Sequence, residues 1–186
     1  DILISFLTAV LQPDSPILSA EVINPELPKD TATNKSVILD VAVKLSDNSK
    51  VDVEMQVANE KNLRKRVPFY LARLHQTQLI VGDKYNHIAP TASIVVLEYN
   101  ETTEENFHTI YELRERHSNN LFSEDLQIHL IELLKLPKFL KHNPTQLKND
   151  DVFWTRFFNS KTPKDLEELA MERPIFKRAN EALKFI

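Results

Sequence analysis

Apolar residues alternate with other residues along two consecutive stretches of the chain, 37–45 and 50–58. Alternation with a period of two is typical of a β-strand with one buried face, because successive side chains point to opposite sides of the sheet. A short polar segment that favours a turn separates the two stretches. Together they predict a β-hairpin.

The turn between the two arms decides which side chains face each other. A three-residue turn, in which Asn48 takes the left-handed conformation that asparagine tolerates, pairs Leu45 with Ser49. Counting back from that pair, Asp40 lies opposite Glu54. A two-residue turn would mix acidic and apolar residues on each face, which is incompatible with one buried apolar face. The favoured register also sets Ala42 opposite Asp52 and Ile38 opposite Gln56, and it predicts a core face of Leu39, Val41, Val43, Val53, Met55 and Val57.

The remaining periodicities predict helices at both ends of the chain and strands between them. Residues 1–11 are apolar nearly all round, which indicates a short buried helix. Helical spacing from residue 59 to about 81 predicts a longer helix, which Pro68 kinks or restarts and Gly82 ends. Further strands are predicted at 17–23, 93–99, 107–114 and 126–134, the last also compatible with a helix, and helices follow Pro137, with Thr162-Pro163 and Pro174 at two helix starts. This order predicts an α+β, or mixed α/β, fold.

Composition limits the classes of function. The chain has 186 residues, 42% of them hydrophobic and 27% charged, which is typical of a folded globular domain. Its net charge is -4, so any contact with nucleic acid requires a local basic patch. The absence of cysteine excludes disulfides and thiolate metal sites and fits a reducing compartment, so a cytoplasmic location is expected. The single glycine excludes phosphate-binding loops, dinucleotide-binding fingerprints and nucleophile elbows, which all need at least two.

The first residues give no sign of a membrane segment. The apolar run 2–11 is too short to span a bilayer, and it follows an acidic residue rather than the basic leading segment of a signal peptide. The chain begins with Asp1 instead of methionine, which indicates a segment taken from a longer protein.

The acidic face of the hairpin is the strongest candidate for chemistry. In the favoured register, the Cβ atoms of Asp40 and Glu54 lie roughly 4.5–5.5 Å apart. Like charges at this distance destabilise a sheet and raise one pKa, and a bound divalent cation removes the conflict. Carboxylate oxygens with positions left for water suit Mg²⁺ or Mn²⁺. The alternative is an ordinary solvent-facing side of a two-faced sheet.

The helix that follows the hairpin is rich in cations, which a phosphate backbone would attract. The alternative is a solvated helix face. Tyr70 and Gln78 lie two turns apart and are further candidates, although Tyr70 also suits core packing. The candidate DNA-binding cations are Lys61, Arg64, Lys65, Arg66 and Arg73.

The stretch "ILDVAVKLSDNSKVDVEMQ" resembles the core motif of the PD-(D/E)xK nuclease superfamily, in which one acid on a strand precedes acid-x-Lys on the next. More closely, it is similar to the Rpn-type recombination-promoting nucleases, a family also described as transposases. The stretch "KRVPFYLARLHQTQLIVGDKYNHIAPTASIVVLEYN" continues the likeness through an Arg-x-x-x-Tyr helix and the next strand. The resemblance covers roughly residues 1–135 well and the remainder loosely.

The resemblance implies a role for several residues. Asp40 and Glu54 would be metal ligands, and the backbone carbonyl of Met55 would complete the site. Gln56 stands where the superfamily usually has lysine, and glutamine can orient groups only through hydrogen bonds. The family also has an acid upstream, for which Asp1 and Glu21 are the candidates.

The resemblance also implies the architecture and the function. We expect a restriction-endonuclease-like core in residues 1–136, with a central mixed sheet flanked by helices, and a C-terminal helical extension in residues 137–186. The implied activity is Mg²⁺- or Mn²⁺-dependent DNA endonuclease activity in a mobile-element or recombination-promoting protein, with DNA as partner, no membrane, and a homodimer left open. One alternative is a DNA- or protein-binding module of the same fold with weak or no activity. Another is a purely structural domain of a mobile element.

Overall fold

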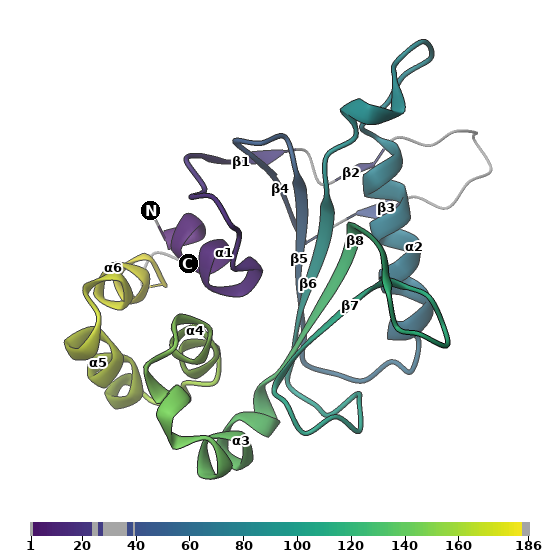
Figure 1. The fold of residues 1–186 in the computed structure, drawn as a ribbon. Coiled ribbons are helices and arrows are strands. Elements are labelled where there is room, and N and C mark those ends of the chain that lie inside the picture. Colours follow the sequence, from purple (N-terminus) through teal and green to yellow (C-terminus); the bar gives the residue numbers. More distant parts are fainter. Residues whose placement is uncertain (1, 24–25, 28–36, 39, 184–186) are drawn as a thin grey trace.

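The computed structural model describes residues 2–23, 26–27, 37–38 and 40–183 (Figure 1). Its centre is a six-stranded mixed sheet with the order β1-β4-β5-β6-β8-β7, and a separate two-stranded sheet pairs β2 with β3. The strands are β1 (Ala20–Ile23), β2 (Glu26–Leu27), β3 (Val37–Ile38), β4 (Val41–Leu45), β5 (Lys50–Gln56), β6 (Thr91–Leu97), β7 (His108–Arg114) and β8 (Leu121–Glu132). The helices are α1 (Ile2–Leu11), α2 (Leu63–Gln76), α3 (Leu136–His142), α4 (Asp150–Phe158), α5 (Pro163–Glu172) and α6 (Pro174–Leu183), with short 3-10 helices at Tyr85–His87, Leu133–Lys135 and Pro144–Lys148.

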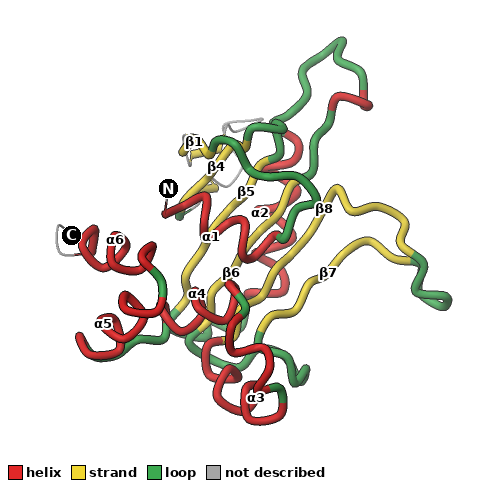
Figure 2. The backbone as a smooth tube through the Cα atoms, turned by 60° about the vertical axis from the view of Figure 1, so that its left-hand side comes forward, coloured by secondary structure: helices red, strands yellow, loops and turns green. Residues whose placement is uncertain are grey.

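This architecture confirms the predicted α+β fold. The sheet is mixed, because β4 and β5 are antiparallel whereas β6 runs parallel to both β5 and β8. Helix α2 covers one face of the sheet, and α1 lies on the other face beside the C-terminal helices (Figure 1). The arrangement is consistent with a restriction-endonuclease-like core. Strand β8 is longer than its partner β6, so the far ends of β7 and β8 project beyond the rest of the sheet (Figure 2).

The hairpin has the predicted three-residue turn. Asn48 has a φ of 70°, the N–H of Leu45 donates to the carbonyl of Ser49 at 2.9 Å, and Ala42 lies opposite Asp52. The positive φ places Asn48 in the left-handed region that asparagine tolerates. The register derived from the two faces is therefore confirmed for β4 and β5.

Beyond the start of β4 the predicted pairing is wrong. Asp40 lies in a bend directly before the strand, so it forms no ladder pair with Glu54. Ile38 lies opposite Glu26 in the small sheet, not opposite Gln56. The first arm of the hairpin is thus divided between two sheets, and Leu39 lies outside the described residues.

The hairpin does not have one buried apolar face and one solvent-facing acidic face. On the predicted core face, Val43 is fully buried, but Met55 and Val57 are 44% and 66% exposed, and Val41 is also exposed. The helices on that side cover only the end near the turn, which explains the difference. The acidic face lies under α2, and Asp52 and Glu54 are 0% and 4% exposed. The interpretation of the acids as a solvated face is therefore wrong for Asp52 and Glu54, whereas Asp40 is exposed.

Helix α2 begins at Leu63 instead of residue 59 and also ends earlier than predicted, and the predicted restart at Pro68 is wrong, whereas a kink there stays a prediction. The helix is continuous through Pro68, because apolar residues on both sides of the proline pack against the sheet. It ends at Gln76, where the hydroxyl of Thr77 donates to the carbonyl of Leu74 at 2.6 Å. Gly82, with a φ of 99°, lies in the following loop.

The C-terminal helices start where the prolines predict. Thr162 and Asp165 form a capping box before Pro163, and α6 begins at Pro174. Their aromatic residues belong to one hydrophobic cluster that also contains α1 and one face of the sheet. The division into a 1–136 core and a 137–186 extension stays a prediction. Among the described residues, no helix has the length and apolar character needed to cross a membrane.

Candidate active site

A pocket of about 310 Å³ lies where the carboxyl end of β5 meets α2. Asp40 reaches it from the bend before β4, and Glu54 reaches it from β5. The pocket is lined by Asp40, Glu54, Met55, Gln56, Val57, Ala58, Glu60, Arg66 and Tyr70. The structure thus brings the two predicted carboxylates to one pocket, although they are not a cross-strand pair.

Asp40 is positioned by the backbone of Met55. The Met55 N–H donates to Oδ2 of Asp40 at 3.3 Å. Because the N–H and C=O of one strand residue point to the same edge, the Met55 carbonyl also faces the side of Asp40. The backbone of Gln56 faces the other way, since its carbonyl accepts the N–H of Glu98 at 3.0 Å. Two carboxylates and one carbonyl oxygen are therefore available on this side of β5.

Opposing effects act on the pKa of the Glu54 carboxyl in the pocket. Burial raises the pKa of its carboxyl, and the charge of Asp40 adds to this rise. Arg66 and a hydrogen bond from Gln56 act in the opposite sense and lower the pKa. The Gln56 Nε2 donates to Glu54 Oε2 at 3.2 Å, and a guanidinium nitrogen of Arg66 lies 3.6 Å from the same oxygen.

Asp52 lies two residues before Glu54 on the same face and is fully buried. The hydroxyl of Ser93 donates to its Oδ2 at 2.9 Å, whereas Oδ1 is buried without a hydrogen-bond partner. Burial, and secondarily the charge of Glu54, raises the pKa of Asp52 to about 7. The buried Asp52 carboxyl therefore keeps its proton up to about pH 7 and adds negative charge beneath the pocket only above that pH.

The pocket offers a hard divalent cation two carboxylates and one backbone carbonyl. Within the described ranges, no three histidine, cysteine, aspartate or glutamate side chains are grouped so that they could hold a metal ion. A cation here would rest on Asp40, Glu54 and the Met55 carbonyl, with water and phosphate in the remaining positions. Mg²⁺ is commonly bound by one or two carboxylates in this manner. The pKa of Glu54 is raised mainly because burial disfavours its charged form, and a bound cation would offset that cost.

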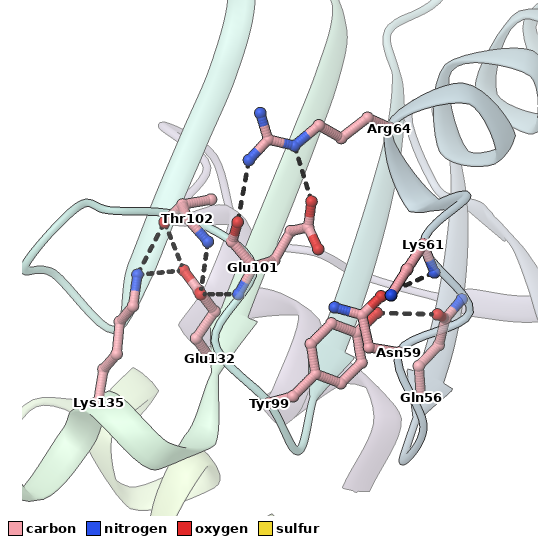
Figure 3. Close-up of polar contacts among 9 residues, drawn as sticks. All are labelled: Gln56, Asn59, Lys61, Arg64, Tyr99, Glu101, Thr102, Glu132 and Lys135. Carbon is pink, nitrogen blue, oxygen red and sulfur yellow. Dashed lines mark hydrogen bonds and ion pairs between the residues drawn. The ribbon is translucent and has the colours of Figure 1, made fainter.

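Both ends of the Gln56 amide are engaged by neighbouring side chains. Its Nε2 donates to Glu54, and its Oε1 accepts the hydroxyl of Tyr99 at 3.3 Å (Figure 3). Gln56 is 9% exposed. Its amide therefore holds Glu54 in place and has little freedom to approach a ligand.

The predicted cations are directed to different places, and Lys61 precedes the start of α2 at Leu63. Arg66 lines the pocket and also contacts Glu60 at 3.2 Å. The Arg64 guanidinium instead donates to the side-chain carboxylate of Glu101 at 2.7 Å and to the backbone carbonyl of Glu101 at 2.9 Å (Figure 3). The other three cations are Lys61 and Lys65, which are exposed, and Arg73, which donates to Gln76 at 3.2 Å.

The remaining candidates divide in the same way. Tyr70 also lines the pocket, and it lies one helical turn after Arg66. Gln78 does not, because its amide forms two hydrogen bonds with the backbone of Ala89, at 2.8 and 2.9 Å. Glu21 lies opposite Lys44 in the β1–β4 ladder and does not line the pocket. Asp1 lies outside the described residues.

A second polar cluster lies at the end of β8 and supports the loop that Arg64 binds. Glu132 is fully buried and accepts the N–H groups of Glu101 and Thr102 at 2.6 and 3.0 Å (Figure 3). Lys135 donates to the same carboxylate at 2.6 Å. Because these donors satisfy the buried charge, this cluster serves the structure of the loop.

The sequence of residues 1–186, the whole chain, matches the family described as PD-(D/E)XK nuclease family transposase. The chain belongs to this family. Among curated proteins, no sequence matches it. Membership of the PD-(D/E)XK nuclease family transposases indicates a nuclease or transposase type of function, and nucleases of this type generally use divalent metal ions.

Two features of this PD-(D/E)XK family member were not predicted from its sequence. Tyr99 supports Gln56 because β5 and β6 are parallel, so their carboxyl ends meet at the same edge of the sheet. That rule applied to the predicted strands would have brought Tyr99 beside the acids. The burial of Asp52 has no signal in the alternation alone, since it depends on α2 covering this face.

Proposed function

We propose that the chain is a Mg²⁺- or Mn²⁺-dependent DNA endonuclease of a mobile-element or recombination-promoting protein. The observation that carries the proposal is the pocket in which Asp40 and Glu54 converge from two separate segments, beside the Met55 carbonyl. Family membership supports a nuclease type of function for the same chain.

Each residue of the pocket has a part in this proposal. Asp40, Glu54 and the Met55 carbonyl would hold the metal. A divalent ion bound there lowers the pKa of water and neutralises charge on the phosphate. Gln56 and Tyr99 fix the orientation of Glu54 through consecutive hydrogen bonds.

The DNA backbone would pass along the exposed side of α2 next to the pocket. Lys65 is exposed on the helix and Lys61 is exposed just before it, and each phosphate that a cation neutralises adds salt-dependent affinity. The proposed DNA contacts remain Lys61, Arg64, Lys65, Arg66 and Arg73.

A plasmid-nicking assay tests the proposal. We expect the wild type to nick supercoiled plasmid with Mg²⁺ or Mn²⁺ and not with EDTA. Asp40→Asn and Glu54→Gln should abolish nicking, because each amide keeps the shape of the side chain but loses the charge that holds a hard cation. Glu167→Gln, at an exposed acid on α5, is the matched control and should nick like the wild type.

Metal binding has a separate readout in thermal melting. Mg²⁺ should raise the unfolding midpoint of the wild type and leave those of Asp40→Asn and Glu54→Gln unchanged, because only a ligand that binds the folded state stabilises it. If the wild type and both variants bind DNA equally, cut nothing and melt identically with and without Mg²⁺ or Mn²⁺, the binding-module alternative replaces the endonuclease.

A further inference from the structure

We infer that Arg66 is a catalytic residue that supplies from α2 the positive charge for the scissile phosphate, which no residue of the hairpin provides. The inference rests on the proposed endonuclease function and adds a specific role for this residue. It also separates Arg66 from the other cations of the helix, which would contact the DNA backbone elsewhere.

The composition of the pocket creates the need for such a charge. Among the described residues that line it, three are acids, Asp40, Glu54 and Glu60, and Arg66 is the only cation. Hydrolysis of a phosphodiester places additional negative charge on the phosphate, and fixed donors aimed at that charge give large rate effects. Gln56 cannot meet this need, because it is neutral and its amide is already bound by Glu54 and Tyr99.

The position of Arg66 suits the role. Its guanidinium lies between two acids, 3.6 Å from the buried Glu54 and 3.2 Å from Glu60 at the rim. The Arg66 side chain is 23% exposed; its Nη1 donates to Glu60 at 3.2 Å, whereas its Nη2 lies 3.6 Å from Glu54 Oε2, longer than a hydrogen bond. The side chain therefore retains donor capacity at the pocket. A guanidinium is also the side chain whose planar fork best matches the oxygens of a phosphate.

Glu60 gives the guanidinium room to change partner. The Glu60 side chain is 62% exposed, so its ion pair with Arg66 is solvated and contributes little to stability. A phosphate entering the pocket can replace that carboxylate without leaving a buried charge unpaired. Glu54, at 5% side-chain exposure, would keep the guanidinium positioned during the exchange.

The competing explanation is that Arg66 merely balances the charge of Glu54. The two roles differ in what they require at saturating metal. A counter-ion affects the folding of the pocket or its metal affinity, whereas a phosphate-binding cation affects the rate of cleavage itself. Placing a lysine at position 56 offers a second way to return a positive charge to the same pocket.

The experiment compares single-turnover plasmid nicking by the full chain at saturating Mg²⁺. Arg66→Met should lower the rate by about 100-fold or more, the usual effect of removing one such donor. Arg66→Lys should retain part of the activity, and Gln56→Lys combined with Arg66→Met should recover at least about tenfold over Arg66→Met alone. Arg178→Met, at an exposed arginine of α6, is the matched control and should keep the wild-type rate.

The outcomes separate the two proposals. If the wild type nicks and Arg66→Met nicks equally fast at saturating Mg²⁺, the role of Arg66 is overturned and the endonuclease stands. A slow Arg66→Met that neither lysine variant improves also overturns it, because charge is then not what matters. If the wild type does not nick at all, both proposals fall. Should Arg66→Met not fold, Arg66→Gln keeps donors for both acids without the charge and gives the same comparison.

Discussion

Replacing Asp52 by asparagine should change how the stability of the metal-free protein depends on pH. The buried Asp52 carboxyl has its pKa raised to about 7 from an ordinary 3.8, first by burial and then by the charge of Glu54. The unfolded chain releases this proton near pH 3.8, whereas the folded chain keeps it up to about pH 7. The stability that this group contributes is therefore complete below pH 3.8 and is lost as the pH rises through 7.

The magnitude follows from the two pKa values. Each pKa unit corresponds to about 1.4 kcal/mol, so the whole loss amounts to about 4 kcal/mol. The part that falls between pH 5 and pH 8 is about 2 to 3 kcal/mol. Asparagine has no charge to bury and escapes this loss. Its amide can leave a buried donor without a partner, which costs about 1 to 3 kcal/mol at every pH, so the slope is the informative quantity.

Urea denaturation in EDTA at several pH values between 5 and 8 measures the effect. The free energy of unfolding of Asp52→Asn, relative to the wild type, should increase by about 2 to 3 kcal/mol from pH 5 to pH 8. Asp14→Asn, at an exposed acid, is the control and should run parallel to the wild type. Parallel curves for Asp52→Asn and the wild type would refute the reasoning.

Three further predictions concern stability. Burial and the nearby His108 lower the pKa of His129 to about 3, so the wild type should lose stability as the pH falls below 6.5. In the same denaturation series, His129→Gln should avoid about 2 kcal/mol of that loss between pH 7 and pH 5. Glu132→Ala should cost about 3 to 5 kcal/mol in urea denaturation, because it leaves Lys135 without its 2.6 Å partner, and a loss below 1 kcal/mol would contradict this account. Thr162→Ala should cost about 1 kcal/mol through loss of the capping box, which the same measurement detects, and an unchanged midpoint would show that the cap is not needed.

The hairpin shows how far local patterns determine the fold. Alternation and the tolerance of Asn48 for positive φ were sufficient to predict the register of β4 and β5. They failed at Ile38, which lies opposite Glu26 in a second sheet. That choice is a competition between two distant partners, and a pattern within one stretch contains no information about it.

The candidate site shows the same limit for side chains. The acids and the cations near them could be named from the sequence, but neighbouring cations could not be told apart. Arg64 and Arg66 differ because Arg64 meets Glu101, which is 37 residues away in the sequence. The orientation of Gln56 likewise depends on Tyr99, which parallel pairing of β5 and β6 brings beside it. Long-range contacts therefore decide which charged residues face the pocket.

The packing of α1 has a consequence for synthesis of the protein. The ring of Phe6 lies 5.6 Å from that of Trp154 in an edge-on contact, and Trp154 lies 4.8 Å from Phe176. During synthesis, α1 thus finds its aromatic partners only when α4 and α6 have been made. Until then the apolar surface of α1 is exposed, and a nascent chain in this state is prone to aggregation and suited to chaperone binding. This layer of the protein must consequently fold late, after translation has passed residue 176.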